Sequence, residues 1–160
     1  MTIRWGILGC GDVARRRVAA AIQQNPNSVL QAVCRRDQQK LQQFCDDFQV
    51  PDSYTDSQQL LEATNIDALY IATPVYLHEP QTVLAAQHGK HVLVEKPMAM
   101  SVRECESMIQ ACQQNQVKLG VAYYRRFYPA VARMAEILSS GELGPPLSVT
   151  AVTATPFNFQ

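Results

Sequence analysis

The sequence predicts an α/β fold with a doubly wound parallel sheet of the Rossmann type, and three observations carry this prediction. Short apolar runs alternate with amphipathic helical patterns along most of the 160 residues. The apolar runs show no alternation of polar and apolar residues, so helices must cover both faces of their sheet. A glycine-rich turn joins the first apolar run to the first helical pattern, which is typical of dinucleotide-binding folds.

Each element is predicted from local periodicity or from turn residues. The apolar runs predict strands at residues 3–8, 29–34, 67–72, 91–94 and 117–122. Apolar residues at i, i+3 and i+4 predict helices at residues 12–24, after Asp37, at residues 77–87, after Ser101 and at residues 129–138. Asp37 is a favourable N-cap, and Ser101 with Glu104 has the spacing of a capping box.

Two of these helices carry apolar stripes, and the stripe of the helix after Ser101 is expected to be its buried face. In the helix after Ser101 the stripe consists of Val102, Cys105, Met108, Ile109 and Cys112. In the helix at residues 129–138 it consists of Val131, Met134, Ala135 and Leu138.

Composition excludes several classes of partner. The 14 lysines and arginines balance 14 aspartates and glutamates, so neither nucleic acid nor an anionic membrane is an expected partner. No apolar stretch is long enough to span a membrane, and the N-terminal run meets a glycine turn too early for a signal peptide. Five scattered cysteines without a Cys-x-x-Cys pair argue against disulfides and zinc. We therefore expect a soluble, cytoplasmic protein without a metal site.

The chain changes character after residue 122. Residues 1–122 contain the alternating pattern and are predicted to form the dinucleotide-binding domain. Residues 123–146 are expected to close that domain with a helix and a linker rich in glycine and proline. A new apolar run at residues 147–155 predicts a strand, and we expect residues 147–160 to be the start of a second domain that is cut short.

The glycine-rich turn lies where a diphosphate would bind. Gly9, Gly11 and Ala14 form the pattern G-x-G-x-x-A between the first strand and the first helix. Gly9 permits the tight turn, Gly11 lets backbone N–H groups approach a pyrophosphate, and Ala14 allows close packing of the helix. Asp12 and Val13 stand at the helix N-terminus, which favours an anion. All five residues are predicted to bind the cofactor.

Two arginines at the end of the second strand bear on which dinucleotide binds. An NAD site usually has Asp or Glu here to accept hydrogen bonds from the ribose 2′-hydroxyl, whereas this chain has Arg35 and Arg36. Guanidinium groups suit a 2′-phosphate by charge and by geometry. NADP is therefore the preferred cofactor and NAD the alternative. Solvent-exposed arginines without a ligand are the other interpretation, and Asp37 could still serve a ribose.

Glu95, Lys96 and Pro97 follow the fourth predicted strand, at the edge of a parallel sheet where ligands bind. A lysine backed by a carboxylate can donate a hydrogen bond to a substrate hydroxyl or carbonyl and help to move its proton. Proline fixes the turn and is a candidate for a cis peptide bond. Lys96 is the predicted catalytic residue.

Four motifs in this order resemble the Gfo/Idh/MocA oxidoreductases, the family of glucose-fructose oxidoreductase and inositol dehydrogenase. They are GILGCGDVA at residues 6–14, IATPVYLH at 71–78, GKHVLVEKPMAMS at 89–101 and AYYRRFYP at 122–129. The resemblance covers essentially the whole chain. It implies an NAD(P)-dependent oxidoreductase that transfers hydride between nicotinamide and a sugar, polyol or related hydroxyl or carbonyl.

The resemblance also implies roles for single residues. The positions that match the family's nicotinamide-side cofactor residues are Thr73, Pro74, His78 and Glu95. Lys96 matches the lysine of the family's EKP motif, which touches the substrate oxygen. Arg126 matches the arginine of its R-F-x-P motif, near the cofactor or the substrate.

The family's second domain, an α+β unit on an open sheet, supplies most of the substrate pocket and a histidine that acts with the EKP lysine. The three histidines of this chain are His78, His88 and His91. All lie in the first domain, so none fits that role. We therefore expect a chain that binds cofactor without being catalytically complete. An uncovered sheet edge and apolar surface also predict a homo-oligomer.

Other functions fit the sequence less well than an oxidoreductase domain. A non-catalytic NADP-binding module that regulates a partner or senses redox state is the alternative, but such a module would not need Lys96. A methyltransferase of the Rossmann type is disfavoured, because the Glu95–Pro97 tripeptide has no part in that chemistry. In a methyltransferase, Arg35 and Arg36 would also face an uncharged ribose.

Overall fold

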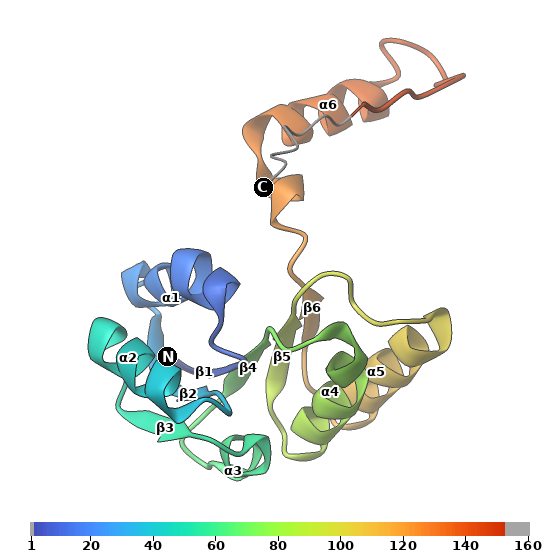
Figure 1. The fold of residues 1–160 in the computed structure, drawn as a ribbon. Helices are drawn as coiled ribbons and strands as arrows, with labels where there is room; N and C mark the ends of the chain where they lie inside the picture. The colour runs from blue at the N-terminus through green and yellow to red at the C-terminus, as the bar shows by residue number, and fades with distance from the viewer. Residues whose placement is uncertain (1, 153–160) are drawn as a thin grey trace, which may run out of the picture. The chain divides into compact units, whose positions relative to one another are not determined.

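The structure is a computed structural model that describes residues 2–152. Its strands are β1 (Ile3–Leu8), β2 (Ser28–Cys34), β3 (Asp52–Tyr54), β4 (Ala68–Ile71), β5 (His91–Val94) and β6 (Leu119–Val121). Its α-helices are α1 (Ala19–Gln24), α2 (Gln38–Phe48), α3 (Ser57–Glu62), α4 (His78–Gln87), α5 (Val102–Gln114) and α6 (Pro129–Ser140) (Figure 1). A π-helical stretch (Ala14–Val18) leads into α1, and 3₁₀ turns (Val75–Leu77 and Tyr124–Phe127) precede α4 and α6. Within residues 2–152, no helix has the length and apolar character needed to cross a membrane.

The six strands are parallel and lie in the order β3-β2-β1-β4-β5-β6. The chain moves outward from β1 to β3 and then returns to pair β4 with the other side of β1. This reversal is a topological switch point, and ligands of such sheets bind at the carboxyl ends of the strands beside it. The predicted fold class, a doubly wound parallel sheet, is confirmed.

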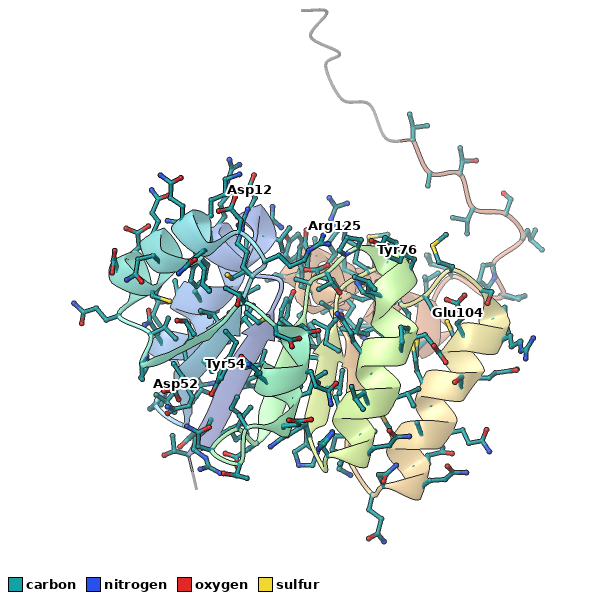
Figure 2. The ribbon with its side chains drawn as sticks, turned by 60° about the horizontal axis from the view of Figure 1, so that its bottom comes forward. Asp12, Asp52, Tyr54, Tyr76, Glu104 and Arg125 are labelled. Carbon is teal, nitrogen blue, oxygen red and sulfur yellow. The ribbon has the colours of Figure 1, made fainter. Side chains whose placement is uncertain are left out.

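Helices cover both faces of the sheet. One core cluster joins α1 and α2 to the sheet and includes Ile7, Ile22, Val33 and Phe44. A second cluster joins α3, α4 and α5 to the opposite face and includes Leu8, Leu60, Leu69, Ala85 and Met108. Ile7 and Leu8 are neighbours in β1 but belong to opposite clusters, which explains why the strand sequence is apolar throughout. Figures 1 and 2 show α4 and α5 lying side by side.

Two helix starts follow the predicted capping signals. The Lys40 backbone N–H donates to the Asp37 carboxylate at 3.0 Å, and α2 begins directly after Asp37, at Gln38. The Glu104 N–H donates to the Ser101 hydroxyl at 3.2 Å, while the Glu104 carboxylate accepts from the Met100 N–H at 2.9 Å. Side chains thus satisfy backbone groups that have no partner inside the helix.

The apolar stripe predicted for α5 is wider than the buried one. Met108 and Cys112 are buried, whereas Val102 is 74% exposed and Ile109 is 44% exposed. The helix packs mainly alongside α4, so only one i, i+4 row of its side chains reaches the core. The prediction that the whole stripe faces the core is wrong.

Residues after Ala122 form a separate unit, which is described by itself. On α6 the predicted stripe is exposed at Val131, Met134 and Leu138. The strand predicted at residues 147–155 is not formed at 147–152, because the described part of this unit offers no strand that could accept its hydrogen bonds. Residues 153–155 lie outside the described residues.

The sequence patterns missed β3 and α3. β3 has three residues, too few to show a period, and α3 has six. A signal for α3 was nevertheless present: Asp56 caps the helix by accepting from the Gln58 N–H at 2.9 Å, and Leu60 and Leu61 are buried. Both elements matter here, because the turn between them borders the site described below.

The cysteines are mainly core residues, as predicted. Cys10, Cys34, Cys45 and Cys112 are buried free thiols, and Cys105 is partly exposed. Burial raises the pKa of the Cys10 thiol to about 11 and that of Cys34 to about 12. Both thiols are therefore neutral at physiological pH and add no negative charge to the edge of the sheet.

An ion pair joins β1 to the residue that precedes β4, at the amino edge of the sheet. The Arg4 guanidinium donates to the two Asp67 carboxylate oxygens at 3.0 and 2.6 Å, and the Arg4 backbone N–H donates to the same carboxylate at 2.8 Å. Hydrogen bonding to Arg4 holds the pKa of Asp67 at about 2. The pair thus fixes the relative position of the two strands that flank the switch point.

We predict that Asp67→Asn destabilises the protein in a pH-dependent way. The folded-state pKa lies below the unfolded value of 3.8, so the ionised pair stabilises the fold above about pH 4 and loses this contribution as the pH falls toward 2. Because Arg4 is 42% exposed, we expect about 1 kcal/mol at pH 7. Urea unfolding from pH 7 down to pH 3 measures the difference, with the exposed Glu106→Gln as control. A difference that does not shrink at low pH would contradict this role.

Candidate functional site

A crevice of about 690 Å³ lies at the carboxyl ends of β1, β2 and β4. Four turns border it: the glycine-rich turn after β1, the turn after β2, the turn between β3 and α3, and the turn after β4 with the start of α4. The lining residues that matter here are Gly9, Gly11, Arg35, Arg36, Asp37, Asp56, Ser57, Thr73, Pro74, Leu77 and Gln81. In Figure 2, Asp12 and Tyr76 mark this end of the sheet and Asp52 marks the other.

Gly9 lies close against the backbone at the end of β4. Its φ of 93° lies in the region that favours glycine. A Cβ at this position would lie 2.8 Å from the carbonyl carbon and oxygen of Ala72 and 2.9 Å from the Thr73 nitrogen. The Gly9 N–H donates to the Cys34 carbonyl at 3.0 Å. The absence of a side chain at Gly9 thus lets the glycine-rich turn lie between the ends of β2 and β4.

Gly11 differs from Gly9 because it faces open space. A Cβ at Gly11 would meet no atom within 4 Å, and its carbonyl accepts the Arg15 N–H at 2.9 Å in the first turn of the helix. Asp12 and Val13 are exposed at the helix start, and Ala14 is fully buried beneath them. The missing side chain leaves room for a phosphate group beside the helix N-terminus.

The two arginines after β2 have different surroundings. The Arg35 guanidinium donates to the Cys10 carbonyl at 2.8 Å and so ties the β2 turn to the glycine-rich turn. Arg36 is exposed and has no hydrogen-bond or ion-pair partner among residues 2–152. The Asp37 carboxylate caps α2, and the Lys40 N–H lowers its pKa. At this end of the crevice, the Arg35 guanidinium is therefore hydrogen-bonded, and the Arg36 guanidinium has no partner among the described residues.

On the β4 side, a buried histidine lies behind the residues that line the crevice. His78 is 1% exposed and does not line the crevice. Its Nε2 lies 2.9 Å from the Thr73 carbonyl oxygen, and its Nδ1 lies 3.1 Å from that of Pro97. His78 therefore joins the turn after β4 to the turn after β5. The Thr73 hydroxyl donates to Gln81 Oε1 at 2.6 Å, inside the crevice.

A tyrosine that the sequence patterns missed holds the carboxylate beside Lys96. The Tyr70 hydroxyl donates to Glu95 Oε1 at 2.5 Å, and the Lys96 backbone N–H donates to Glu95 Oε2 at 3.0 Å. Tyr70 is 5% exposed, whereas Lys96 is exposed. The Lys96–Pro97 peptide bond is cis. Both carboxylate oxygens are thus fixed after β5 while the lysine side chain faces solvent.

The predicted site residues fall into three groups. Those that line the crevice together are Gly9, Gly11, Arg35, Arg36, Thr73 and Pro74. Asp12, Val13, Ala14 and His78 adjoin lining residues in the chain without lining the crevice, whereas Glu95 and Lys96 follow β5 and do not line it. Arg126 belongs to the second unit, where its guanidinium lies over the Phe127 ring with 5.9 Å to the ring centroid.

The family comparison agrees with this geometry. Residues 3–123 match the model of GFO_IDH_MocA, described as an oxidoreductase family with an NAD-binding Rossmann fold. Oxidoreductase P35 of Formosa agariphila is 36% identical to this chain over 146 residues, which are 91% of this chain and 46% of that protein. D-xylose 1-dehydrogenase (NADP(+)) 2 of Haloferax volcanii is 34% identical over 147 residues, 92% of this chain and 45% of that protein.

A solved structure gives the same result. The scyllo-inositol dehydrogenase of Lactobacillus casei, with bound NAD(H) and scyllo-inositol, superposes with a TM-score of 0.83 at 26% identity. The match covers 90% of this chain and 43% of that one. The chain therefore spans about half the length of the curated relatives it matches.

We predict a large stability effect at Gly9 and a small one at Gly11. Gly9→Ala should destabilise the fold by about 2 kcal/mol or more, because the new Cβ meets backbone atoms at a positive φ. Gly11→Ala should change stability by less than about 1 kcal/mol, because it meets nothing. Thermal and urea unfolding of both variants measure this contrast. If the two variants lost the same free energy of unfolding, the close contact of Gly9 with the end of β4 would not be what requires glycine there.

Proposed function

This chain belongs to the Gfo/Idh/MocA family of oxidoreductases with an NAD-binding Rossmann fold, and from this premise we propose that its crevice binds NADP in preference to NAD. We further propose that the protein transfers hydride between the nicotinamide ring and a sugar, polyol or related hydroxyl or carbonyl. The observation that carries the proposal is the space left by Gly11 beside the helix start, at the switch point of the sheet.

The preference for NADP rests on Arg36. Its guanidinium is exposed at the β2 side of the crevice and has no partner among the described residues, so it is available to pair with a 2′-phosphate. Arg35 also lines the crevice, but its bond to the Cys10 carbonyl gives it a second role in holding the phosphate-binding turn. The Asp37 carboxylate, occupied as a helix cap, is less suited to bind a ribose hydroxyl.

We predict that Arg36→Glu weakens NADPH binding about tenfold to a hundredfold, as the loss of a charge-assisted hydrogen bond requires. NADH binding should change little, because NADH lacks the 2′-phosphate. Fluorescence titration of the purified chain with each cofactor measures both constants. Arg16→Glu makes the same charge change on an exposed helical residue outside the crevice and is the control. Tighter binding of NADH than of NADPH by the wild-type chain would refute the preference.

Lys96 is the proposed catalytic residue. When bound, the nicotinamide ring accepts or supplies the hydride. The Lys96 ammonium or amine would hold and move the proton of the substrate oxygen, giving it to a carbonyl or taking it from a hydroxyl. The Glu95 carboxylate, fixed by the Tyr70 hydroxyl, would keep negative charge beside the lysine. His78 would act by positioning the Thr73–Pro74 turn, and the role of Arg126 near the cofactor or the substrate stays a prediction.

We predict that Lys96→Met lowers kcat by about a hundredfold to ten-thousandfold in a form of the protein that turns over substrate. Cofactor affinity should stay within about twofold, because the Lys96 side chain does not line the crevice. Steady-state kinetics with a panel of sugars and polyols, together with cofactor titration, separates the two effects. Lys118→Met, at another exposed lysine, is the control. An unchanged rate would remove Lys96 from the mechanism.

The expected homo-oligomer and the cytoplasmic location stay predictions. The same is true of the start of a second, substrate-binding domain at residues 147–160. Light scattering of the purified protein tests the oligomeric state directly.

A further inference from the structure

Gln81 lies in the first turn of α4 and lines the β4 side of the crevice with Thr73 and Leu77. Its side chain is half-buried. The Thr73 hydroxyl donates to Gln81 Oε1 at 2.6 Å, which fixes the amide through its oxygen. The two N–H groups on Nε2 then remain as donors, and nothing in residues 2–152 accepts a hydrogen bond from them.

The surroundings of Gln81 make these donors valuable to a ligand. Pro74 and Leu77 line the same wall and offer no side-chain hydrogen bond. Both ring nitrogens of His78 already lie within hydrogen-bond distance of backbone carbonyls. The Gln81 amide is therefore held in place by Thr73, while its N–H groups have no acceptor among residues 2–152. Because its neighbours are apolar, a hydrogen bond from the Gln81 amide to a ligand is stronger here than the same bond at a fully solvated surface.

We propose that Gln81 binds the nicotinamide-ribose half of the dinucleotide through its amide N–H groups, an inference that rests on the proposed cofactor. The two halves of a dinucleotide lie on opposite sides of the switch point. Arg36 assigns the adenosine half to the β2 side, so the other half lies on the β4 side, where Gln81 is found. The ribose hydroxyls and the adjoining phosphate oxygens of that half are hydrogen-bond acceptors.

Two variants separate this role from a structural one. Gln81→Leu removes all hydrogen bonding at similar size, and should weaken NADPH binding about threefold to tenfold. Gln81→Glu keeps an oxygen that accepts from the Thr73 hydroxyl but replaces the N–H donors with a second anionic oxygen. It should therefore weaken NADPH binding more than Gln81→Leu does. If Gln81 only held Thr73 in place, Gln81→Glu would be the milder change. Gln87→Leu, at the exposed end of the same helix, is the matched control.

The ligand is varied as well, in fluorescence and calorimetric titrations of the purified chain. NADPH and 2′-phospho-ADP-ribose both carry the second ribose, whereas 2′,5′-ADP lacks it. Gln81→Leu should weaken the first two ligands and leave 2′,5′-ADP within about twofold. Equal NADPH affinity in wild type and Gln81→Leu, or an equal loss for 2′,5′-ADP, would overturn the role of Gln81. If the wild-type chain binds neither NADPH nor NADH, the proposed cofactor itself fails.

Discussion

The close approach of Gly9 to the end of β4 is the constraint on which the rest of the site depends. A residue with a side chain would collide there with the backbone of Ala72 and Thr73, so the turn can sit between β2 and β4 only because Gly9 has no Cβ. That position brings the turn within reach of the Arg35 guanidinium, which binds the Cys10 carbonyl. The crevice is thus built by backbone contacts between the ends of three strands, and its side chains are placed around them.

The crevice has two chemically different ends. On the β2 side, Arg36 contributes to the lining a positive charge that no side chain of residues 2–152 pairs, while the buried thiols of Cys10 and Cys34 stay neutral. On the β4 side the wall is uncharged, with Thr73 and Gln81 joined by a hydrogen bond. An elongated ligand with an anionic end and a polar, hydroxyl-bearing end would match this arrangement. The proposed dinucleotide has both.

The turn after β5 is organised by bonds from two neighbouring elements. Tyr70 in β4 holds the Glu95 carboxylate, and His78 in α4 lies against the carbonyls of both Thr73 and Pro97. Lys96 therefore stands on a turn that is fixed on two sides while its own side chain is free. The proposed role of Lys96 in proton transfer would use this arrangement, because an exposed side chain on a fixed turn can reach a bound substrate.

The sequence by itself determined the fold class, most element positions, the glycine-rich turn and the family, because periodicity, caps and turn residues act over a few residues. It missed β3 and α3, which are too short to show a period. Only the tertiary structure decided which polar side chains are already occupied: Arg35 is bonded to Cys10 and Arg36 is not, while His78 is buried and Gln81 faces the crevice. The partner of a polar group depends on which strands meet at the edge of the sheet, and residues far apart in the chain become neighbours only there.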